Sequence, residues 1–370
     1  MRKFIQISTV FVFVIVLFTG CKEERRLIVG GYTKPGANGL SLFDFNAQSG
    51  DLKLVSDGDA GPNPSFLCYS AKNNLIYAID EVNDFKGSAA GGLTIIKLHN
   101  ETGSLEKIGE MAIPVGGPCN IAMSPDSGYL FIANYPKGSV AVVKLNKNGI
   151  PDAITDSIIY QTAAPDTSHA HMITSDPAGK RIYVSDLGLN RIMIYNFDKV
   201  SGKLKESENG IINLSKGSGP RHFTFSSDGS KMYVINELGS TIMVFNTSVS
   251  EGLKLVQTVP TIRKDFRGSN NCADIHISND GKFLYGSNRG ENSIVVFRIE
   301  TDGTLTLAGH TSCGGDWPRN FALDPSGKFI LVANQKSNDI AVFRIDKRTG
   351  LPLEPSKNIK SPAPVCLKFL

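Results

Sequence analysis

The sequence predicts an all-β protein, a seven-bladed β-propeller, and three observations carry this prediction. A pattern of two short strands joined by a turn recurs along the chain, with a period of about 45–50 residues. Residues 27–32 match only the second strand of the pattern, and residues 364–369 match only the first. Complete copies of the first strand occur six times, at residues 63–70, 118–124, 169–175, 220–226, 272–278 and 318–324.

The clearest copy of the repeat spans residues 219–245. Residues 221–225 alternate between polar and apolar side chains, as a half-buried strand does, and a turn signal follows at Ser227-Asp228-Gly229. A second strand is expected over residues 231–236 and a third over residues 241–245. One small sheet cannot bury its faces until neighbouring sheets stack on it, so this repeat predicts a ring of sheets.

The two incomplete copies predict how the ring closes. The mature chain enters its first blade one strand late, and the missing strand lies at the C-terminus. A C-terminal strand that completes the N-terminal blade leaves no open sheet edge. Six complete copies and this shared blade give seven blades.

The first residues of the chain precede the fold. Arg2 and Lys3 are followed by an apolar run over residues 5–18, which is too short to span a membrane as a helix. Residues 1–20 are therefore predicted to be a signal peptide of the lipoprotein type.

The end of this segment predicts a lipid anchor. The stretch Phe18-Thr19-Gly20-Cys21 resembles a bacterial lipobox, so Cys21 is the expected lipidation site. Residues 21–26 then form a short tether, and residues 27–370 form the propeller domain. We expect an exported protein, anchored through its lipid on the periplasmic face of the membrane or on the cell surface.

Composition narrows the class of protein. The formal net charge is +4, and no basic tract is interleaved with aromatic residues, which argues against nucleic-acid binding. After Cys21 the chain has an odd number of cysteines without close pairs, which argues against a disulfide framework and a zinc site. We expect a monomer with no metal or cofactor.

Candidate site residues emerge when the repeats are aligned on their turn glycines. The start of one strand and the end of its antiparallel neighbour lie at the same edge of a sheet. We therefore expect polar side chains from both positions to meet at one mouth of the central channel. Near the start of the innermost strands lie Ser65, Asn120, His171, Arg221, Ala273 and Arg319. Just past the second strands lie Tyr32, Glu81, Tyr135, Leu187, Glu237, Arg289 and Gln335.

Several neighbouring residues have both a functional and a structural interpretation. Asn236 and Asn288 are candidate substrate-binding residues, but the recurring Asn or Asp at this position also suits a turn cap. His222 and His169 are further candidates for substrate binding. His169 and His171 are spaced to share one face of a strand, yet no third metal ligand is identifiable by spacing.

At these motifs the chain resembles a known family. Gly-Pro-Arg-His at 219–222, Asn-Glu-Leu at 236–238 and Trp-Pro-Arg-Asn at 317–320 resemble the bacterial lactonases. These are the seven-bladed-propeller 6-phosphogluconolactonases, which are related to the fungal carboxy-cis,cis-muconate cyclase. The resemblance covers essentially all of residues 27–370.

The resemblance implies a sugar lactonase, with catalytic residues that fall on His171, Arg221, Glu237 and Arg289. Arg319 is then expected to contact the substrate. The family motif Ala-Glu-Ile-His is replaced here by Ala273-Asp274-Ile275-His276. Export is the second departure, because hexose phosphates are cytosolic.

Three functions follow from this interpretation. The leading one is hydrolysis of a sugar lactone, a small-molecule substrate, with His171 or Glu237 as the base and arginines as anion contacts. A cyclase-like lyase is the second. The third is a surface-anchored propeller that binds a glycan or a protein without catalysis.

Overall fold

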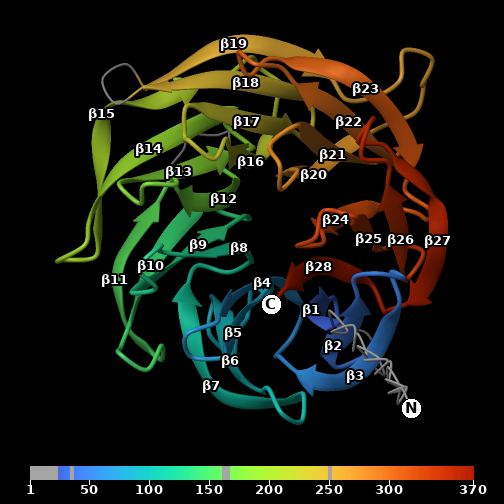
Figure 1. The fold of residues 1–370 in the computed structure, drawn as a ribbon. Coiled ribbons are helices and arrows are strands. Elements are labelled where there is room, and N and C mark those ends of the chain that lie inside the picture. Colours follow the sequence, from blue (N-terminus) through green and yellow to red (C-terminus); the bar gives the residue numbers. More distant parts are fainter. Residues whose placement is uncertain (1–23, 34–36, 161–166, 249–251) are drawn as a thin grey trace, which may run out of the picture.

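The computed structural model describes residues 24–33, 37–160, 167–248 and 252–370. In these residues 28 strands form seven four-stranded antiparallel sheets arranged as a ring (Figure 1). The predicted seven-bladed propeller is confirmed. The predicted signal peptide and the predicted lipidation site at Cys21 lie outside the described residues.

Blade 1 takes strands from both ends of the chain, and the other blades are consecutive. Blade 1 consists of β28 (Pro364–Phe369), β1 (Glu24–Gly31), β2 (Gly39–Asn46) and β3 (Leu52–Asp59). Blade 2 consists of β4 (Pro64–Ser70), β5 (Leu75–Asp80), β6 (Ala90–His99) and β7 (Ser104–Pro114). Blade 3 consists of β8 (Pro118–Met123), β9 (Tyr129–Asn134), β10 (Ser139–Leu145) and β11 (Pro151–Ile159).

The remaining four blades repeat this order, innermost strand first. Blade 4 consists of β12 (Ala170–Ser175), β13 (Arg181–Asp186), β14 (Arg191–Asp198) and β15 (Lys203–Asn213). Blade 5 consists of β16 (Pro220–Phe225), β17 (Lys231–Asn236), β18 (Thr241–Ser248) and β19 (Gly252–Pro260). Blade 6 consists of β20 (Asn271–Ile277), β21 (Phe283–Arg289), β22 (Ser293–Ile299) and β23 (Leu305–Ser312). Blade 7 consists of β24 (Pro318–Leu323), β25 (Phe329–Asn334), β26 (Asp339–Ile345) and β27 (Pro352–Lys360).

The ring closes as the sequence predicts. Strand β28 pairs antiparallel with β1, with Leu27 opposite Phe369 and Gly30 opposite Cys366, and it is the innermost strand of blade 1 (Figure 1). Strand β1 begins at Glu24, so the last three residues of the expected tether, 24–26, already belong to the sheet. They pair with β2, where Arg26 lies opposite Asp44.

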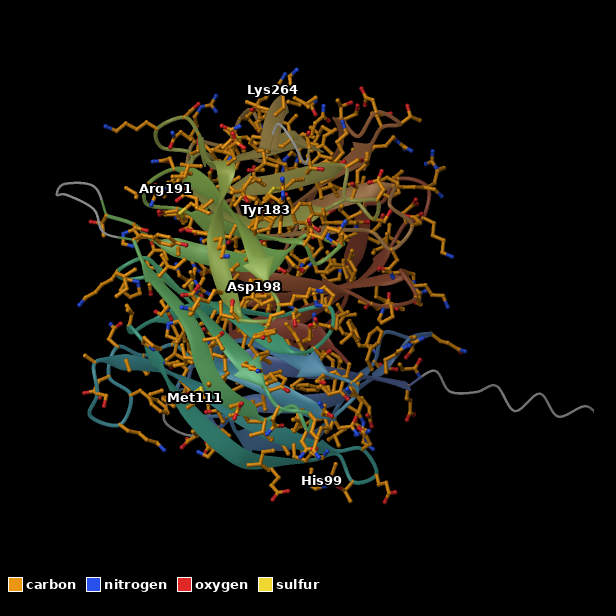
Figure 2. The ribbon with its side chains drawn as sticks, turned by 90° about the vertical axis from the view of Figure 1, so that its left-hand side faces the viewer. His99, Met111, Tyr183, Arg191, Asp198 and Lys264 are labelled. Carbon is orange, nitrogen blue, oxygen red and sulfur yellow. The ribbon has the colours of Figure 1, made fainter. Side chains whose placement is uncertain are left out.

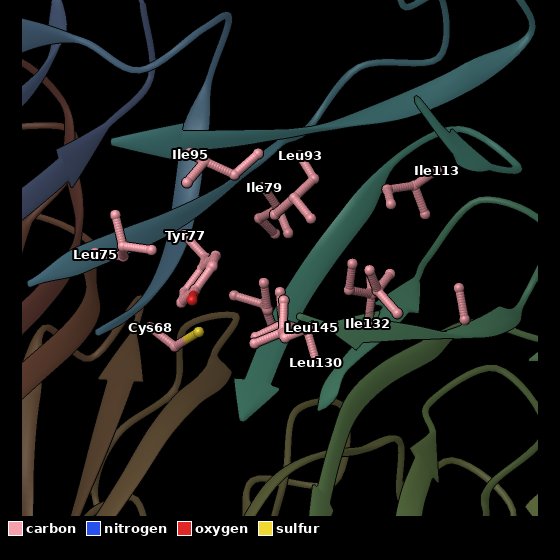
Figure 3. Packing of buried hydrophobic residues seen from close by; sticks show 13 residues of the cluster. Cys68, Leu75, Tyr77, Ile79, Leu93, Ile95, Ile113, Leu130, Ile132 and Leu145 are labelled. Atoms are coloured by element: carbon pink, nitrogen blue, oxygen red, sulfur yellow. The ribbon is translucent and has the colours of Figure 1, made fainter. Parts of the chain in front are cut away.

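Apolar side chains fill the space between neighbouring blades. Figure 3 shows one such cluster, in which Tyr77 and Ile79 of blade 2 pack with Leu130 and Ile132 of blade 3. All four are fully buried. Sheets that are covered on both faces explain why the middle residues of the second strands are mostly apolar rather than alternating.

Buried tyrosines link successive blades through their hydroxyl groups. Tyr77 Oη donates to the carbonyl of Gly149 in the next blade at 2.7 Å, and Tyr285 Oη donates to that of Gly350 at 2.8 Å. Both glycines have positive φ, 80° and 74°, a conformation that favours glycine. Each bond satisfies a buried hydroxyl and fixes the spacing of two blades.

Polar and charged side chains cover the outside of the ring. In the side view of Figure 2, Arg191 and Asp198 mark the two ends of β14. Each of the five cysteines in the described residues is buried and carries a free thiol. Within these residues no helix is long and apolar enough to cross a membrane.

Candidate active site

A β-bulge near the start of each innermost strand builds the site. In β16, Pro220 pairs with Asn236 and His222 pairs with Ile235, so Arg221 between them has no partner in the ladder. A bulge turns such a residue out of the regular alternation. The same irregularity occurs in every blade. The bulge ring consists of Ser65, Cys119, His171, Arg221, Ala273, Arg319 and Val365.

The alignment from sequence is wrong by one residue in blade 3. Pro118 pairs with Asn134 and Asn120 pairs with Ala133, so the bulge residue is Cys119 rather than Asn120. The pairing register of the two strands determines which residue forms the bulge. The sequence does not show this register, because nothing in the residue types distinguishes Cys119 from Asn120 as the bulge. Asn120 belongs instead to a second ring, one residue further along each strand. The second ring consists of Phe66, Asn120, Met172, His222, Asp274, Asn320 and Cys366.

A third set of residues, the rim ring, follows the second strand of each blade. The backbone N–H of Glu237 donates to the carbonyl of Gly219 at 2.7 Å, and that of Glu81 donates to Asn63 at 3.1 Å. Each rim residue therefore lies beside the residue two positions before a bulge. The rim ring consists of Tyr32, Glu81, Tyr135, Leu187, Glu237, Arg289 and Gln335.

Glu237 joins the bulge ring to the rim ring. Its Oε2 lies 2.9 Å from Nε of Arg221 and 2.7 Å from Nη2 of Arg289. The two guanidinium groups are nearly buried, whereas 18% of the Glu237 side chain is exposed. The predicted meeting of these three side chains at one mouth of the channel is confirmed.

Backbone carbonyl groups hold both arginines in place. Arg221 Nη1 donates to the carbonyl of Ala273 at 2.7 Å, and Arg289 Nη2 donates to that of Cys272 at 3.0 Å. Burial and the nearby charge of Arg221 lower the pKa of Arg289 to about 10, which leaves it cationic at pH 7. The positive charges are therefore fixed before any ligand binds.

His171 completes this side of the mouth as a neutral base. Its ring packs edge-on against Tyr135 and His222, with centroids 5.6 and 5.2 Å apart. Burial and the charge of Arg221 lower the pKa of His171 well below its ordinary value. The imidazole therefore stays unprotonated at neutral pH.

A second cluster of polar side chains, formed by Tyr32, Glu81 and Arg319, lies across blades 1, 2 and 7. Tyr32 Oη donates to Glu81 Oε2 at 3.0 Å, and Arg319 Nη2 lies 3.8 Å from the same oxygen. The Arg319 guanidinium also lies over the Tyr32 ring, 5.5 Å from its centroid. Burial raises the pKa of Tyr32 to about 12, so its hydroxyl stays a donor. The alignment of the repeats places Tyr32 and Glu81 at the rim but does not predict their contact, because one blade's sequence does not show which other blade it faces.

Some buried polar atoms of the two rings have no hydrogen-bond partner. Among the described residues ten buried side-chain nitrogen and oxygen atoms lack such a partner. Four of the ten belong to the bulge ring or the rim ring: Ser65 Oγ, His171 Nδ1, Gln335 Oε1 and Arg221 Nε, which has its ion pair with Glu237. Buried polar atoms are normally paired, so unpaired ones at a channel mouth indicate a place where a polar ligand binds.

The other candidate residues serve the framework around this mouth. His169 Nδ1 contacts the carbonyl of Tyr135 at 2.9 Å, and its ring stacks on that of Tyr135 with centroids 4.4 Å apart. Asn236 Nδ2 donates to Thr241 Oγ1 at 2.9 Å, and Asn288 Nδ2 donates to the Thr261 carbonyl at 2.8 Å. Both asparagines are fully buried. These contacts agree with the structural interpretation, and we leave all three residues out of the proposed substrate contacts.

His222 lies behind Arg221 in the second ring. Its Nε2 accepts from Arg221 Nη1 at 3.2 Å, and its Nδ1 donates to Asp274 Oδ1 at 2.8 Å. His222 is 4% exposed, so it acts on a substrate only through Arg221. Within the described residues, no group of three His, Cys, Asp or Glu side chains is placed to hold a metal ion.

The fold and this mouth define a class of protein, a closed seven-bladed propeller with a polar site where its channel opens. The chain belongs to the family described as Lactonase, 7-bladed beta-propeller, whose model matches residues 26–369. This finding confirms the resemblance seen in the sequence.

Individual relatives agree with the family. A protein named 6-phosphogluconolactonase from Bacillus subtilis (strain 168) is 28% identical over 349 residues, which cover 92% of this chain and 97% of that protein. Another of that name, from Formosa agariphila, is 34% identical and covers 81% of this chain and 86% of the relative. The solved structure of a periplasmic gluconolactonase from Pseudomonas aeruginosa is 29% identical, with a TM-score of 0.88 over 94% of this chain and 99% of that one.

Proposed function

We propose that this chain hydrolyses a sugar lactone at the channel mouth that holds Glu237, Arg221, Arg289 and His171. The observation that carries the proposal is a partly exposed carboxylate held between two anchored guanidinium groups beside a neutral imidazole. Lactone hydrolysis needs a base for water and positive charge for the developing oxyanion. The family and the names of its relatives support the same reaction.

In the proposed mechanism, Glu237 is the general base. Both arginines contact Oε2, which leaves Oε1 for a water molecule. The water oxygen attacks the lactone carbonyl while Glu237 takes the proton. The ring C–O bond then breaks, and the proton returns to the ring oxygen that leaves. Arg221 and Arg289 stabilise the oxyanion, and His171 orients the substrate through a hydrogen bond at Nδ1.

We further propose that the preferred substrate carries no phosphate. The second cluster combines Arg319 and Tyr32 as donors with Glu81 as an acceptor. Such a set suits sugar hydroxyl groups, which both donate and accept. A phosphate in this cluster would lie against the Glu81 carboxylate, which opposes it. The Pseudomonas relative, named a periplasmic gluconolactonase, supports a neutral sugar lactone as well.

Hydrolysis of gluconolactone and of its 6-phosphate by the purified protein, corrected for spontaneous ring opening, tests both statements. We expect turnover of both lactones, with the larger kcat/KM for gluconolactone. Turnover of neither lactone would contradict the proposed reaction and favour a binding protein or a lyase. A larger kcat/KM for the 6-phosphate would contradict only the substrate preference.

We also propose that the protein is an exported lipoprotein with its lipid on Cys21, and that it acts as a monomer. The proposed anchor rests on the lipobox-like stretch before Cys21, and export is supported by the periplasmic relative. Cys21→Ser should move the protein from the membrane fraction to the soluble fraction, or leave its signal peptide uncut. A Cys21→Ser protein that is cut normally and stays in the membrane fraction would disprove the anchor, and a dimer in light scattering would disprove the monomer.

A further inference from the structure

The second ring contains one carboxylate, that of Asp274, whereas the other blades have no acidic residue at this position. Asn120 Oδ1 accepts from the backbone N–H of Ile173 in the next blade at 3.1 Å, and Asn320 Oδ1 accepts from that of Leu367 at 2.6 Å. Asp274 makes the same bond to Phe321 at 3.2 Å. An asparagine therefore suffices for this link between blades, and the charge of Asp274 needs another explanation.

The additional contacts of Asp274 point toward the site. Its Oδ1 accepts from His222 Nδ1 at 2.8 Å, and its Oδ2 accepts from His276 Nε2 at 2.9 Å and from Asn320 Nδ2 at 2.5 Å. Asp274 and His222 are only 3% and 4% exposed. The Asp274 carboxylate thus accepts hydrogen bonds from both flanking blades. Its Oδ1 accepts from His222, and its Oδ2 accepts the other bonds.

This arrangement fixes the tautomer of His222. A carboxylate only accepts hydrogen bonds, so His222 Nδ1 must carry the proton, and Nε2 is left as an acceptor. Arg221 Nη1 donates to that nitrogen at 3.2 Å. Burial and the charge of Arg221 lower the pKa of His222 to about 4, so the ring is neutral at pH 7.

We propose that Asp274 is a positioning residue for lactone hydrolysis, which aims the Arg221 guanidinium at the reacting carbonyl by holding His222 in its Nδ1–H tautomer. The inference rests on the proposed function for the part that Arg221 plays. A chain of one carboxylate, one imidazole and one guanidinium then runs from the second ring to the bulge ring. Its first two members do not touch the substrate.

Asp274→Asn separates this role from the link between blades. If the amide oxygen keeps the bonds from Asn320 and Phe321, as asparagines do in the sister blades, the amide nitrogen faces His222 Nδ1. His222 Nδ1 must then accept from this amide, so the proton of the imidazole moves to Nε2. There it faces the N–H donor of Arg221. Arg221 Nη1 then loses His222 as an acceptor and keeps the Ala273 carbonyl, while the fold keeps its bond between blades.

Nitrogen-15 NMR of the histidine rings and lactonase kinetics test the proposal together. In the unmodified protein His222 should be protonated at Nδ1, and in Asp274→Asn at Nε2. We expect kcat/KM to fall by about 10- to 100-fold in Asp274→Asn, as for the loss of one hydrogen bond to a charged group. In an Arg221→Ala background, Asp274→Asn should have no further effect, because the two residues act through one contact.

A second substitution keeps the proposal testable if the Asp274→Asn protein does not fold. His222→Met places in blade 5 the residue that blade 4 holds at the same position, Met172, and it removes the acceptor for Arg221. It should reproduce the kinetic loss and also have no further effect in Arg221→Ala. An unchanged His222 tautomer in Asp274→Asn, or losses that multiply with Arg221→Ala, would overturn the proposal. Absence of lactonase activity in the unmodified protein contradicts the proposed function instead, and the NMR result still decides the hydrogen-bond chain.

Discussion

At the scale of single residues, the site depends on charges that are fixed before a substrate arrives. Arg221 and Arg289 both donate to backbone carbonyl groups of β20, and both contact Glu237. Preorganised charge of this kind stabilises a developing oxyanion without reorganisation during the reaction. Both the arginines and Glu237 act in the transition state of the proposed reaction, so replacing any of them should lower kcat.

The first prediction concerns the arginine of the rim ring. Arg289→Ala should lower kcat for the lactone by about 10- to 150-fold, because the oxyanion loses a charge-assisted contact worth about 1.5–3 kcal/mol. Steady-state kinetics measures this change. Arg348→Ala, on the exposed loop after β26, is the matched control and should leave kcat unchanged. A normal kcat in Arg289→Ala would contradict its role in stabilising the oxyanion.

The second prediction concerns pH. Burial and the Arg221 charge lower the pKa of His171 well below its ordinary value of 6.5, so this residue does not change protonation between pH 6 and 8. A plot of kcat/KM against pH should therefore show no inflection near pH 6.5 that comes from His171. An inflection there that disappears in His171→Asn would contradict the neutral assignment.

At the scale of structural elements, an asparagine near the end of the second strand ties this strand to the third strand in blades 3, 5 and 6. Asn134, Asn236 and Asn288 donate to the hydroxyl of a Ser or Thr at the start of the third strand, at 2.9 to 3.1 Å. Blade 2 departs from this pattern, because Asp80 occupies the position and both of its oxygens share the Thr94 hydroxyl as a donor, at 3.2 and 3.0 Å. Burial raises the pKa of Asp80 to about 7.

The third prediction follows from this raised pKa. The folded protein binds a proton at Asp80 more tightly than the unfolded chain, so the stability it contributes is present at acidic pH and is lost as pH rises toward 7. Asp80→Asn removes this loss and should raise the free energy of unfolding at pH 8 by about 1–3 kcal/mol, the cost of a poorly satisfied buried polar group. Chemical denaturation at pH 5 and pH 8 measures the difference.

A matched control for Asp80→Asn exists in blade 4. Asp186 occupies the equivalent position but accepts from Arg191 Nε at 3.1 Å and from Ser168 Oγ at 2.7 Å. Asp186→Asn should therefore destabilise the fold. Equal effects of the two substitutions at pH 8 would contradict the assignment of a penalty to Asp80.

At the scale of the whole molecule, closure of the ring depends on strand β28. Cys366 and Leu367 are buried in two different core clusters, one on each side of blade 1. The N–H of Leu367 also donates to Asn320 of blade 7 at 2.6 Å. Removal of this strand opens a gap in the ring rather than fraying one end.

The fourth prediction tests this closure. Deletion of residues 365–370 should lower the melting temperature in one cooperative transition of the whole protein, as calorimetry would show. Lys368→Ala, which removes an exposed side chain from the same strand, should leave the melting temperature nearly unchanged. Full-length stability in the truncated protein would disprove the role of β28 in closure.

The repeat was sufficient to predict the number of blades, the shared blade and the meeting of Arg221, Glu237 and Arg289. It was not sufficient to place Cys119 in the bulge ring, because a bulge changes register without a distinctive sequence. The repeat also does not predict which side chains from different blades contact one another. Glu81 contacts Tyr32 and Arg319 from two other blades, and that contact depends on how far each side chain reaches across the closed ring.

The proposed reaction depends most directly on Glu237 as the base at the channel mouth. The decisive measurement is kcat for gluconolactone, corrected for spontaneous hydrolysis, in Glu237→Gln and in the control Glu101→Gln, which alters an exposed turn. General-base catalysis contributes about 10²- to 10⁴-fold, so kcat of the folded protein should fall by that factor in Glu237→Gln and stay normal in the control. A normal kcat in Glu237→Gln would contradict the proposed mechanism.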